Sequence, residues 1–418
     1  MEQIFTGKVA VIGLGYIGLP TAAALATRGL EVVGVDVNDD TVKAVNHGEV
    51  PFVEPDLAIA VSGAVAMGRL TATKQVPEAD AFIIAVPTPF QSDRSADLSY
   101  IRGAVEAIAP KLRGGEVIIL ESTSPPGTAL ALSEWVAELR PDLTLPHQSE
   151  GVPDVYVAHC PERVLPGRVM IEIVTNDRVI GGITTRCAEK AATLYRVFCQ
   201  GQLLLSDAAS AEMAKLVENA YRDVNIAFAN ELSLISDQLK LDVWEVIRLA
   251  NHHPRVNILT PGPGVGGHCI AVDPWFIVAA APEHAKLIRA AREVNDSKPD
   301  HVAQQVIAKA GRFNAPTVAC LGLAFKANID DLRESPAVQV VEHIAAALPD
   351  VDVLACEPYV EELPRELSGM KNVKLTRTSE ALEAADIVVL LVDHDQFRTI
   401  NRSLLAGKVV YDTRGVLR

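Results

Sequence analysis

The chain has 418 residues, of which 49% are hydrophobic, and its formal net charge is −15. This length exceeds one ordinary core, so two or three domains are expected. The acidic balance argues against nucleic acid or an anionic membrane as a partner, because both bind basic surfaces. The six cysteines form no Cys-x-x-Cys pair, which argues against zinc-ribbon, iron–sulfur and disulfide-framework proteins. Neither a long apolar run nor an export signal is present, so a cytoplasmic protein without a membrane span is expected.

A short apolar strand at residues 8–12 leads into a glycine-rich turn, G-x-G-x-x-G, at residues 13–18, and an Ala-rich helix is predicted to follow. A second strand, 31–36, ends in Asp36. The glycines permit close approach of the backbone to a pyrophosphate, to which the helix N-terminus offers N–H groups. Asp36 can accept hydrogen bonds from ribose hydroxyls and would repel a 2′-phosphate. The unit therefore predicts NAD rather than NADP as the cofactor.

Two further apolar runs, 80–86 and 116–120, are predicted to be parallel strands that are covered on both faces. Ligands in such folds bind beyond the carboxyl ends of the strands, so Thr88 and Thr123 are candidate cofactor or substrate contacts. A helix cap or a turn is the alternative role for each threonine.

A strand that begins near residue 155 leads into a loop with one acid and two arginines, Glu162, Arg163 and Arg168. The arginines either form a solvated salt bridge with the acid or bind phosphate.

One long helix is predicted from about residue 210 to residue 238, a stretch without proline or glycine. Lys215, Asn219 and Arg222 follow the spacing i, i+4 and i+7, so they share one face of it. Such a polar stripe on a largely apolar helix is costly to bury unless it faces a ligand or a polar partner; a solvated face is the alternative. A helix of this length between two α/β halves is also a natural dimer surface.

Four glycines lie within residues 262–267, directly before His268 and Cys269. Glycines let the backbone approach a substrate, and a cysteine becomes a nucleophile where positive charge or a helix N-terminus favours the thiolate. The alternative is that Cys269 is a small apolar filler in a turn.

No metal is expected at this loop, because the spacing of the nearby potential ligands fits no common site. These ligands are His252, His253, His268, Cys269 and Asp273. Histidines followed by Arg255 suit polar or phosphate contacts better.

Past residues 298–299 the pattern restarts as a second α/β half without the G-x-G-x-x-G turn. Strands are predicted at 318–325 and 351–356, and two later runs, 385–392 and 407–413, echo the strands of the first half. This half should bind a nucleotide differently from the first, or bind something other than a dinucleotide.

The loop after the first strand of this half carries Lys326 and Arg333 ahead of a helix that Ser335 is expected to cap. An anion would dock there, at a helix N-terminus. Solvated charges offset by neighbouring acids are the alternative. If both basic side chains point inward, a diphosphate substrate fits this acidic protein.

The glycine-rich turn, the helix with Lys215 and Asn219, the loop with Cys269 and Asp273, and the second α/β half together resemble the UDP-sugar 6-dehydrogenases over essentially the whole chain. The UDP-glucose branch usually carries G-G-S-C-F-P-K-D where this chain has G-G-H-C-I-A-V-D. With the segment 162–167, this loop looks most like the bacterial branch that oxidises UDP-N-acetyl-D-mannosamine. The resemblance therefore favours an N-acetylated sugar.

The resemblance implies an α/β fold of two Rossmann-like doubly wound domains, joined by a long central helix and a helical middle domain. The expected bounds are 1–205 for the NAD-binding domain, 206–300 for the helical domain with the glycine/cysteine loop, and 301–418 for the UDP-sugar-binding domain. A homodimer through the central helix is expected.

The activity that the resemblance implies is a four-electron oxidation of the sugar C6 alcohol to a carboxylate with two NAD in succession. Cys269 attacks the intermediate aldehyde to give a thiohemiacetal, a second hydride transfer gives a thioester, and water releases the acid. The product, UDP-N-acetyl-D-mannosaminuronate, would serve bacterial surface polysaccharide synthesis.

The resemblance also assigns roles to single residues. Lys215 is the expected proton donor and acceptor and stabilises an oxyanion, with Asn219 as a hydrogen-bond donor. Glu162 and Asp273 are acid/base or water-positioning groups, and Thr123 holds the catalytic water.

The remaining expected site residues contact the two ligands. The cofactor contacts are Gly13, Gly15, Tyr16, Ile17, Gly18, Asp36, Thr88, Thr123 and Arg333. The substrate contacts are Arg163, Val164, Lys215, Asn219, Arg222, His252, Arg255, Gly266, Phe325, Lys326 and Arg414, with Arg255 acting across a dimer interface.

Other functions stay open. UDP-N-acetylglucosamine and UDP-glucose are alternative substrates within the family. A two-electron dehydrogenase of hydroxy acids would need no cysteine and would yield one NADH per substrate. A non-catalytic protein that binds NAD or a nucleotide sugar would show binding without turnover.

Overall fold

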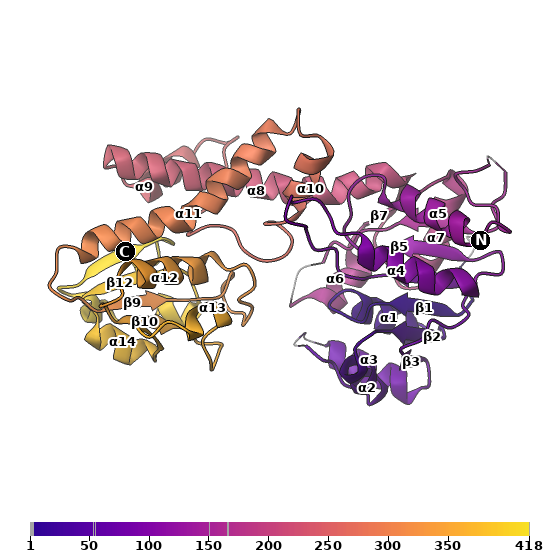
Figure 1. Cartoon of the computed structure of the whole chain (residues 1–418), viewed down its shortest axis with the longest axis horizontal. Helices are drawn as coiled ribbons and strands as arrows, with labels where there is room; N and C mark the ends of the chain where they lie inside the picture. Colours follow the sequence, from indigo (N-terminus) through magenta and orange to yellow (C-terminus); the bar gives the residue numbers. More distant parts are fainter. Residues whose placement is uncertain (1–3, 53, 55, 150, 165–166, 418) are drawn as a thin grey trace. The chain divides into compact units, whose positions relative to one another are not determined.

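The computed structural model describes residues 4–52, 54, 56–149, 151–164 and 167–417. Within the segment 162–167, Leu165 and Pro166 lie outside the described residues. The chain divides into two compact units, Met1–Val217 and Glu218–Arg418. Figure 1 follows it from indigo at the N-terminus to yellow at the C-terminus.

The first unit is built on an eight-stranded sheet in the order β3-β2-β1-β4-β5-β6-β7-β8. Its strands are β1 (Val9–Ile12), β2 (Val32–Val35), β3 (Leu70–Thr73), β4 (Ala81–Ile84), β5 (Val117–Leu120), β6 (Tyr156–His159), β7 (Arg178–Gly182) and β8 (Leu203–Asp207). All neighbours pair in parallel except β6 and β7, which are antiparallel. The strand order reverses between β1 and β4, and ligands bind beyond the carboxyl ends of the strands at such a point.

Helices cover both faces of this sheet (Figure 1). They are α1 (Gly18–Thr27), α2 (Asp39–Asn46), α3 (Leu57–Ala66), α4 (Ser99–Ile108), α5 (Thr128–Leu139), α6 (Val169–Thr175) and α7 (Thr185–Tyr195), with a 3₁₀ turn η1 (Ala109–Lys111). Every residue of β1 is buried, and its alternate side chains enter two different hydrophobic clusters. This explains why the predicted strands are continuous apolar runs rather than alternating ones.

Three strands of the first unit were not predicted from the sequence. β3 and β8 lie at the two edges of the sheet. The exposed Thr71 interrupts the apolar pattern of β3, whereas the leucines of β8 are apolar but lie at an exposed edge. β7 begins with the charged residue Arg178, whose burial depends on distant partners described below. Edge position and long-range pairing therefore concealed these strands.

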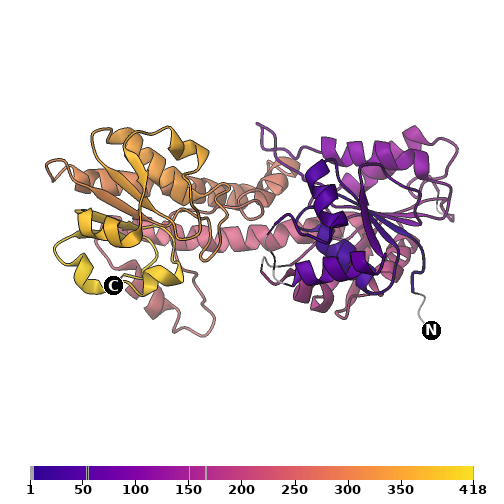
Figure 2. The same cartoon turned by 90° about the horizontal axis from the view of Figure 1, so that it is seen from below.

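The predicted long helix is confirmed as α8 (Ala208–Leu239), which has 32 residues. At 1.5 Å per residue it extends for about 48 Å. Figure 2 shows it as one continuous helix.

The second unit continues with three helices, α9 (Val243–Ala250), α10 (Asp273–Ala280) and α11 (Lys286–Ala310). The predicted restart past residues 298–299 is not a helix boundary, because α11 runs through Pro299. Pro299 lacks the N–H that would bond the carbonyl of Asn295. The helix continues because it packs along α10 and α12, and tertiary packing here outweighs the local preference of proline.

A second, five-stranded sheet has the order β11-β10-β9-β12-β13 and is parallel throughout. Its strands are β9 (Val318–Leu321), β10 (Val353–Cys356), β11 (Val373–Leu375), β12 (Ile387–Leu390) and β13 (Val409–Asp412). Its helices are α12 (Pro336–Ala347), α13 (Arg365–Ser368), α14 (Thr378–Ala384) and α15 (Asp395–Arg398), with a 3₁₀ turn η2 (Arg402–Leu405). Two hydrophobic clusters, one on each face, enclose this sheet.

The echo between the two α/β halves is confirmed by matching hydrogen bonds. The backbone of Lys8 donates to Asp80 Oδ2 at 2.8 Å, and the N–H of Asp80 donates to the carbonyl of Lys8 at 2.9 Å. Thr317 and Asp386 make the same two bonds, both at 2.9 Å. The first pair joins the start of β1 to the start of β4, and the second joins the start of β9 to the start of β12. The second half therefore repeats the architecture of the first.

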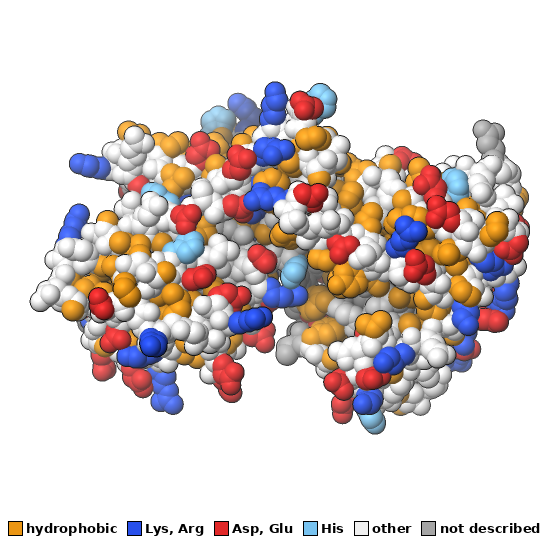
Figure 3. Space-filling model, viewed as in Figure 1, with side chains coloured by type: hydrophobic (Ala, Val, Ile, Leu, Met, Phe, Trp, Pro, Cys, Tyr) orange, Lys and Arg blue, Asp and Glu red, His pale blue; other side chains and the backbone are white. Residues whose placement is uncertain are grey.

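Acidic and basic side chains are interspersed on the face seen in Figure 3. Within the described part of the chain, no helix is both long enough and apolar enough to cross a bilayer.

Candidate active site

The three glycines of the turn after β1 have different surroundings. Gly13 has φ +94° and a Cβ there would overlap the carbonyl of Ala85, while a Cβ on Gly18 would overlap the carbonyl of Gly13. Around Gly15, by contrast, no described atom lies within 4 Å of the Cβ position. The first glycine thus shapes the turn, the third lets α1 pack closely, and the second leaves open backbone that a pyrophosphate can approach.

The first turn of α1 is available to an anion. Its N-cap residue, Ile17, makes no side-chain capping bond among the described residues. The hydroxyl of Tyr16 bonds to Glu54 and accepts a hydrogen bond from the Gly167 N–H at 3.3 Å. Burial, reinforced by Glu54, raises the pKa of Tyr16. Tyr16 therefore links the glycine-rich turn to the segment that follows β6.

The carboxylate of Asp36 is held at the carboxyl end of β2, beside the glycine-rich turn. Its Oδ2 accepts from the N–H of Leu14 and its Oδ1 from the N–H of Asn38, each at 2.9 Å. The side chain is half-buried. This is the placement expected of an acid that binds the adenosine ribose.

Two hydroxyls tie the ends of β4 and β5 together. Thr88 Oγ1 donates to the carbonyl of Thr123 at 2.7 Å, and Ser122 Oγ donates to the carbonyl of Val86 at 2.7 Å. The next helix, α5, is capped by Gly127 rather than by Thr123. Thr123 therefore does not cap α5, and both threonines lie just beyond the carboxyl ends of neighbouring strands.

A buried charged cluster next to this edge was missed by the sequence analysis. Glu121 accepts hydrogen bonds from Thr21 Oγ1 at 3.0 Å and from the Tyr195 hydroxyl at 2.8 Å, and it pairs with Arg178 at 3.8 Å. Burial raises the pKa of Glu121, although Arg178 opposes the shift. Glu121 could have been predicted from the sequence, because it directly follows an apolar strand. No pattern in the neighbouring sequence indicated that Arg178 would be buried beside it.

The loop after β6 holds Glu162 with little exposure to solvent. Its Oε2 accepts from the Val164 N–H at 2.8 Å. Burial raises the pKa of Glu162, and the charge of Lys215 opposes this. Arg163 donates to the carbonyl of Asp177 at 3.2 Å. The acid is therefore fixed by backbone and lies within electrostatic reach of Lys215.

Lys215 also acts on His159, the last residue of β6. Burial, reinforced by the positive charge of Lys215, lowers the pKa of His159 to about 3. Lys215 itself is half-buried on α8. Within the first unit, the predicted residues Lys215 and Glu162 thus belong to one electrostatic neighbourhood.

In the second unit, the glycine loop packs against the loop that follows β9. A Cβ on Gly266 would lie 2.5 Å from the carbonyl of Glu334, and one on Gly267 would lie 2.9 Å from the ring of Phe325. The Gly267 N–H donates to the carbonyl of Arg333 at 3.2 Å. Glycine is required at both positions because backbone and ring leave no room for a side chain.

Cys269 is exposed at the end of this loop, one turn before α10. Its carbonyl accepts from the N–H groups of Val272 at 3.1 Å and Asp273 at 2.9 Å. Arg333, held by Asp331 through bonds of 2.9 and 2.6 Å, interacts electrostatically with Cys269. Positive charge beside a thiol favours the nucleophilic thiolate. Cys269 is thus exposed at the end of the loop rather than packed in a core.

Asn219 and Asp273, two predicted site residues far apart in the chain, are in direct contact. Asn219 Nδ2 donates to Asp273 Oδ2 at 2.6 Å. Asp273 is only 3% exposed. The polar residue on α8 therefore fixes the acid that begins α10.

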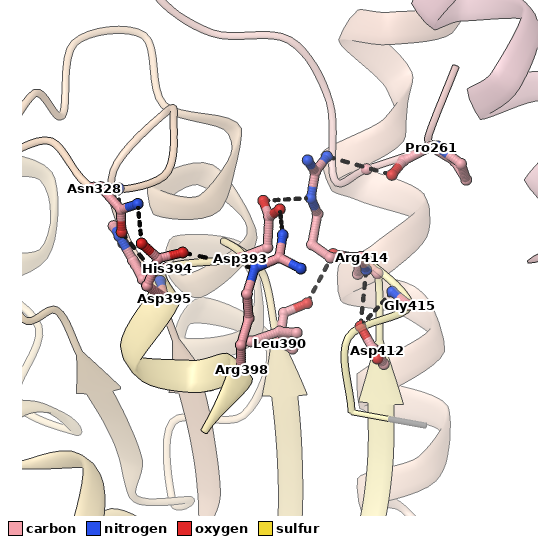
Figure 4. Close-up of polar contacts among 12 residues, drawn as sticks. Pro261, Asn328, Leu390, Asp393, His394, Asp395, Arg398, Asp412, Arg414 and Gly415 are labelled. Carbon is pink, nitrogen blue, oxygen red and sulfur yellow. Dashed lines mark hydrogen bonds and ion pairs between the residues drawn. The ribbon is translucent and has the colours of Figure 1, made fainter. Parts of the chain in front are cut away.

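Arg414 follows β13 and joins the start of the glycine loop to a carboxylate (Figure 4). Its Nε donates to Asp393 Oδ1 at 3.0 Å and its Nη1 to the carbonyl of Pro261 at 3.3 Å. Asp393 also pairs with Arg398 at 2.5 Å. Burial alone would raise the pKa of Asp393, but the two arginines bring it below its usual range.

The other predicted basic contacts are on the surface. Arg222, His252, Arg255 and Lys326 are exposed. Ser335 caps α12 as predicted, accepting from the Ala337 N–H at 3.2 Å. Among the described residues, no group of three His, Cys, Asp or Glu side chains is arranged to hold a metal ion.

Three segments of the chain match the UDP-glucose/GDP-mannose dehydrogenase family. They are its NAD binding domain at residues 7–199, its central domain at 209–297 and its UDP binding domain at 319–418. Fold, glycine-rich turn and matches together define an NAD-dependent dehydrogenase of UDP-sugars. The chain belongs to the UDP-glucose/GDP-mannose dehydrogenase family.

Several relatives are similar over nearly their full length. An NDP-N-acetyl-D-galactosaminuronic acid dehydrogenase of Ralstonia nicotianae is 57% identical, covering 98% of this chain and 96% of the relative. A UDP-N-acetyl-D-mannosamine dehydrogenase of Escherichia coli is 54% identical, covering 98% and 99%. Among solved structures, the UDP-N-acetyl-D-mannosamine dehydrogenase of Pyrococcus horikoshii is 37% identical with a TM-score of 0.87, covering 98% of this chain and 96% of that one.

Proposed function

We propose that the enzyme oxidises C6 of UDP-N-acetyl-D-mannosamine twice, to UDP-N-acetyl-D-mannosaminuronate, through a covalent adduct on Cys269. The observation that carries this proposal is an exposed cysteine at the end of a tightly packed glycine loop, with Arg333 as a neighbouring charge and a helix N-terminus following it. An oxidation that stops at the aldehyde would need no such residue.

The first unit offers a site that fits NAD. The open backbone at Gly15 and the N–H groups of α1 would receive the pyrophosphate, and Asp36 would bind the adenosine ribose. Gly13, Tyr16, Ile17, Gly18, Thr88, Thr123 and Arg333 complete the proposed cofactor contacts. Bound NAD accepts one hydride in each oxidation.

In the first oxidation, Lys215 in its neutral amine form accepts the proton of the C6 hydroxyl and becomes an ammonium, and Asn219 donates a hydrogen bond to the substrate oxygen. The Cys269 thiolate then adds to the aldehyde carbon, and the carbonyl oxygen takes up a proton to give a thiohemiacetal. Loss of a second hydride and of that proton leaves a thioester. Water held by Thr123, with Glu162 or Asp273 as the base, releases the carboxylate and returns the thiolate.

The nucleotide sugar would be held mainly by basic and aromatic side chains. The proposed contacts are Arg163, Val164, Lys215, Asn219, Arg222, His252, Arg255, Gly266, Phe325, Lys326 and Arg414. We assign NAD binding to residues 1–205, the helical core with the reactive loop to 206–300, and UDP-sugar binding to 301–418. The use of the product in bacterial surface polysaccharide synthesis rests on the family resemblance alone.

The sugar is best tested with a panel of UDP-N-acetylmannosamine, UDP-N-acetylglucosamine, UDP-N-acetylgalactosamine and UDP-glucose. The names of the relatives from Ralstonia nicotianae and Escherichia coli support an N-acetylated hexosamine. We expect two NADH per sugar and the highest kcat/KM for the mannosamine derivative. A preference for another sugar would refute the substrate, and one NADH per sugar would refute the two-step chemistry.

The covalent step is tested by Cys269→Ala, with Cys199→Ala as the matched control. Cys199 is a half-buried thiol that bonds to the carbonyl of Asn176 in the first unit. We expect Cys269→Ala to abolish carboxylate formation while NAD affinity is retained, and the control to be active. Normal steady-state oxidation by Cys269→Ala would overturn the mechanism.

We also propose a homodimer through α8, with Arg255 acting across the interface. Large apolar side chains stay exposed along one stripe of this helix. The stripe consists of Met213, Val217, Tyr221, Phe228, Ile235 and Leu239. Such a surface marks an interaction site. Phe228→Glu should convert a dimer to a monomer in light scattering, and a monomeric wild type would contradict the assignment.

A further inference from the structure

A buried chain of hydrogen bonds connects the start of the glycine loop to the interior of the second unit. The Gly262 N–H donates to Asn230 Oδ1 at 2.8 Å, and Asn230 Nδ2 donates to Asn295 Oδ1 at 2.8 Å. Asn295 Nδ2 in turn donates to Asp223 Oδ1 at 2.8 Å. The chain thus runs from the loop to α8, across to α11, and back to α8.

The chain ends in a buried ion pair. Arg292 Nη1 donates to Asp223 Oδ1 at 2.6 Å, and the same guanidinium also bonds to Asp296. Asp223 and Asn230 are fully buried, and Arg292 and Asn295 are each 1% exposed. Burial raises the pKa of Asp223, although Arg292 opposes the shift. Buried polar groups are costly unless they are bonded, so this network holds its members in one arrangement.

One face of α8 fixes both ends of the reactive segment. Asn219 bonds to Asp273, which follows Cys269, and Asn230 bonds to Gly262, which precedes it. The two asparagines are 230 − 219 = 11 positions apart. At 3.6 residues per turn this separation returns to within about 20° of the same face. The segment 262–273 is therefore anchored at both ends to one rigid element.

Arg414 bonds to the carbonyl group at the start of the same loop, as Figure 4 shows. Arg414 Nη1 donates to the carbonyl of Pro261, and a Cβ on Gly262 would lie 2.5 Å from that nitrogen. The peptide between Pro261 and Gly262 thus has its carbonyl bonded on one side and its N–H bonded on the other. It can shift only by breaking one of these bonds.

We propose that Asn230 and Asn295 are positioning residues for Cys269. In this role they act through the backbone: they set where the glycine loop begins and thereby where Cys269 is presented. The meaning of this role rests on the proposed function, in which Cys269 must meet a C6 aldehyde. Displacement of a reacting group by about 1 Å can cost about 10²-fold in rate.

The test compares Asn230→Ala and Asn295→Ala with the control Asn225→Ala. Asn225 is also on α8, but among the described residues its amide bonds locally, to the carbonyl of Tyr221 at 2.7 Å. In the full-length enzyme, four quantities are measured: kcat, the KM for NAD, the Tm, and the rate at which iodoacetamide labels Cys269, followed by peptide mass.

We expect Asn230→Ala to lower kcat by about 10- to 100-fold and to change the Cys269 labelling rate several-fold, with the KM for NAD unchanged. Asn295→Ala leaves the Gly262 bond in place and should show a smaller change of the same kind. It also keeps the proposal testable where Asn230→Ala does not fold. A structural role alone would lower the Tm of both variants and leave kcat and labelling at the control values well below that Tm.

Two outcomes overturn different statements. Control-like kcat and labelling in folded Asn230→Ala and Asn295→Ala, together with an inactive Cys269→Ala, would refute the positioning role and keep the proposed function. Full activity of Cys269→Ala would refute the proposed function itself, whatever the asparagine variants do.

Discussion

The glycine-rich turn allows binding and folding to be perturbed separately, by Gly15→Ala and Gly18→Ala. At Gly15 an added methyl meets no described atom within 4 Å, and the backbone does not need positive φ. At Gly18 the methyl would overlap the carbonyl of Gly13 and lie 3.2 Å from Ala85 Cβ. The first change therefore alters only the surface that is proposed to receive the pyrophosphate, whereas the second forces α1 away from β1.

The magnitudes follow from these contacts. Overpacking costs about 1–3 kcal/mol, which for a unit of this size lowers the Tm by about 2–12 °C in Gly18→Ala. Gly15→Ala should keep its Tm within about 2 °C. Loss of one hydrogen bond to a charged group costs about 1.5–3 kcal/mol, so its NAD affinity should fall by about 10- to 100-fold.

Calorimetric titration with NAD and thermal melts of the apo-enzymes measure both quantities. Wild-type NAD affinity in Gly15→Ala would show that the pyrophosphate binds elsewhere. A wild-type Tm in Gly18→Ala would show that α1 does not depend on this close approach.

Three further changes test buried polar groups through measurements of stability. Glu357 accepts from the Leu323 N–H at 2.7 Å and from His394 Nε2 at 3.0 Å; burial alone would raise its pKa, but these bonds lower it. Its contribution should be present near neutral pH and lost as pH falls through that depressed pKa. The Tm deficit of Glu357→Gln should therefore narrow in acid, and a constant deficit would contradict this. Burial raises the pKa of Glu212 to about 7. The free energy of unfolding should therefore fall by up to about 3 kcal/mol as pH rises from about 4 to 7. Glu212→Gln should flatten this pH dependence, and an unchanged slope would mean that another group causes it. Ser335→Ala removes a helix cap and a 2.6 Å bond to the Leu323 carbonyl, which should cost about 1–2 kcal/mol; a denaturant midpoint equal to that of wild type would contradict it.

Features that depend on neighbours in the chain were predictable from the sequence. The glycines of the turn, the acid after the second strand and the apolar runs are read from local conformational freedom and from burial on both faces of a sheet. The long helix was predicted because residues 210–238 contain neither proline nor glycine. Ser335 was predicted as a cap because a proline follows it at the first helical position, and its hydroxyl bonds to a backbone N–H only two residues further on.

Features that depend on distant partners were decided by the tertiary structure. Arg178 is buried only because Glu121 and Tyr195 surround it from other elements, and a lone arginine in the sequence gives no sign of this. α11 passes through Pro299 because packing on both sides compensates for the missing N–H. The asparagines on α8 and α11 look alike in the sequence as polar interruptions of helices. In the folded chain, Asn230 bonds to Gly262 at the start of the glycine loop and Asn219 bonds to Asp273 after its end. A buried amide must bond to whatever backbone or side chain the fold brings within reach.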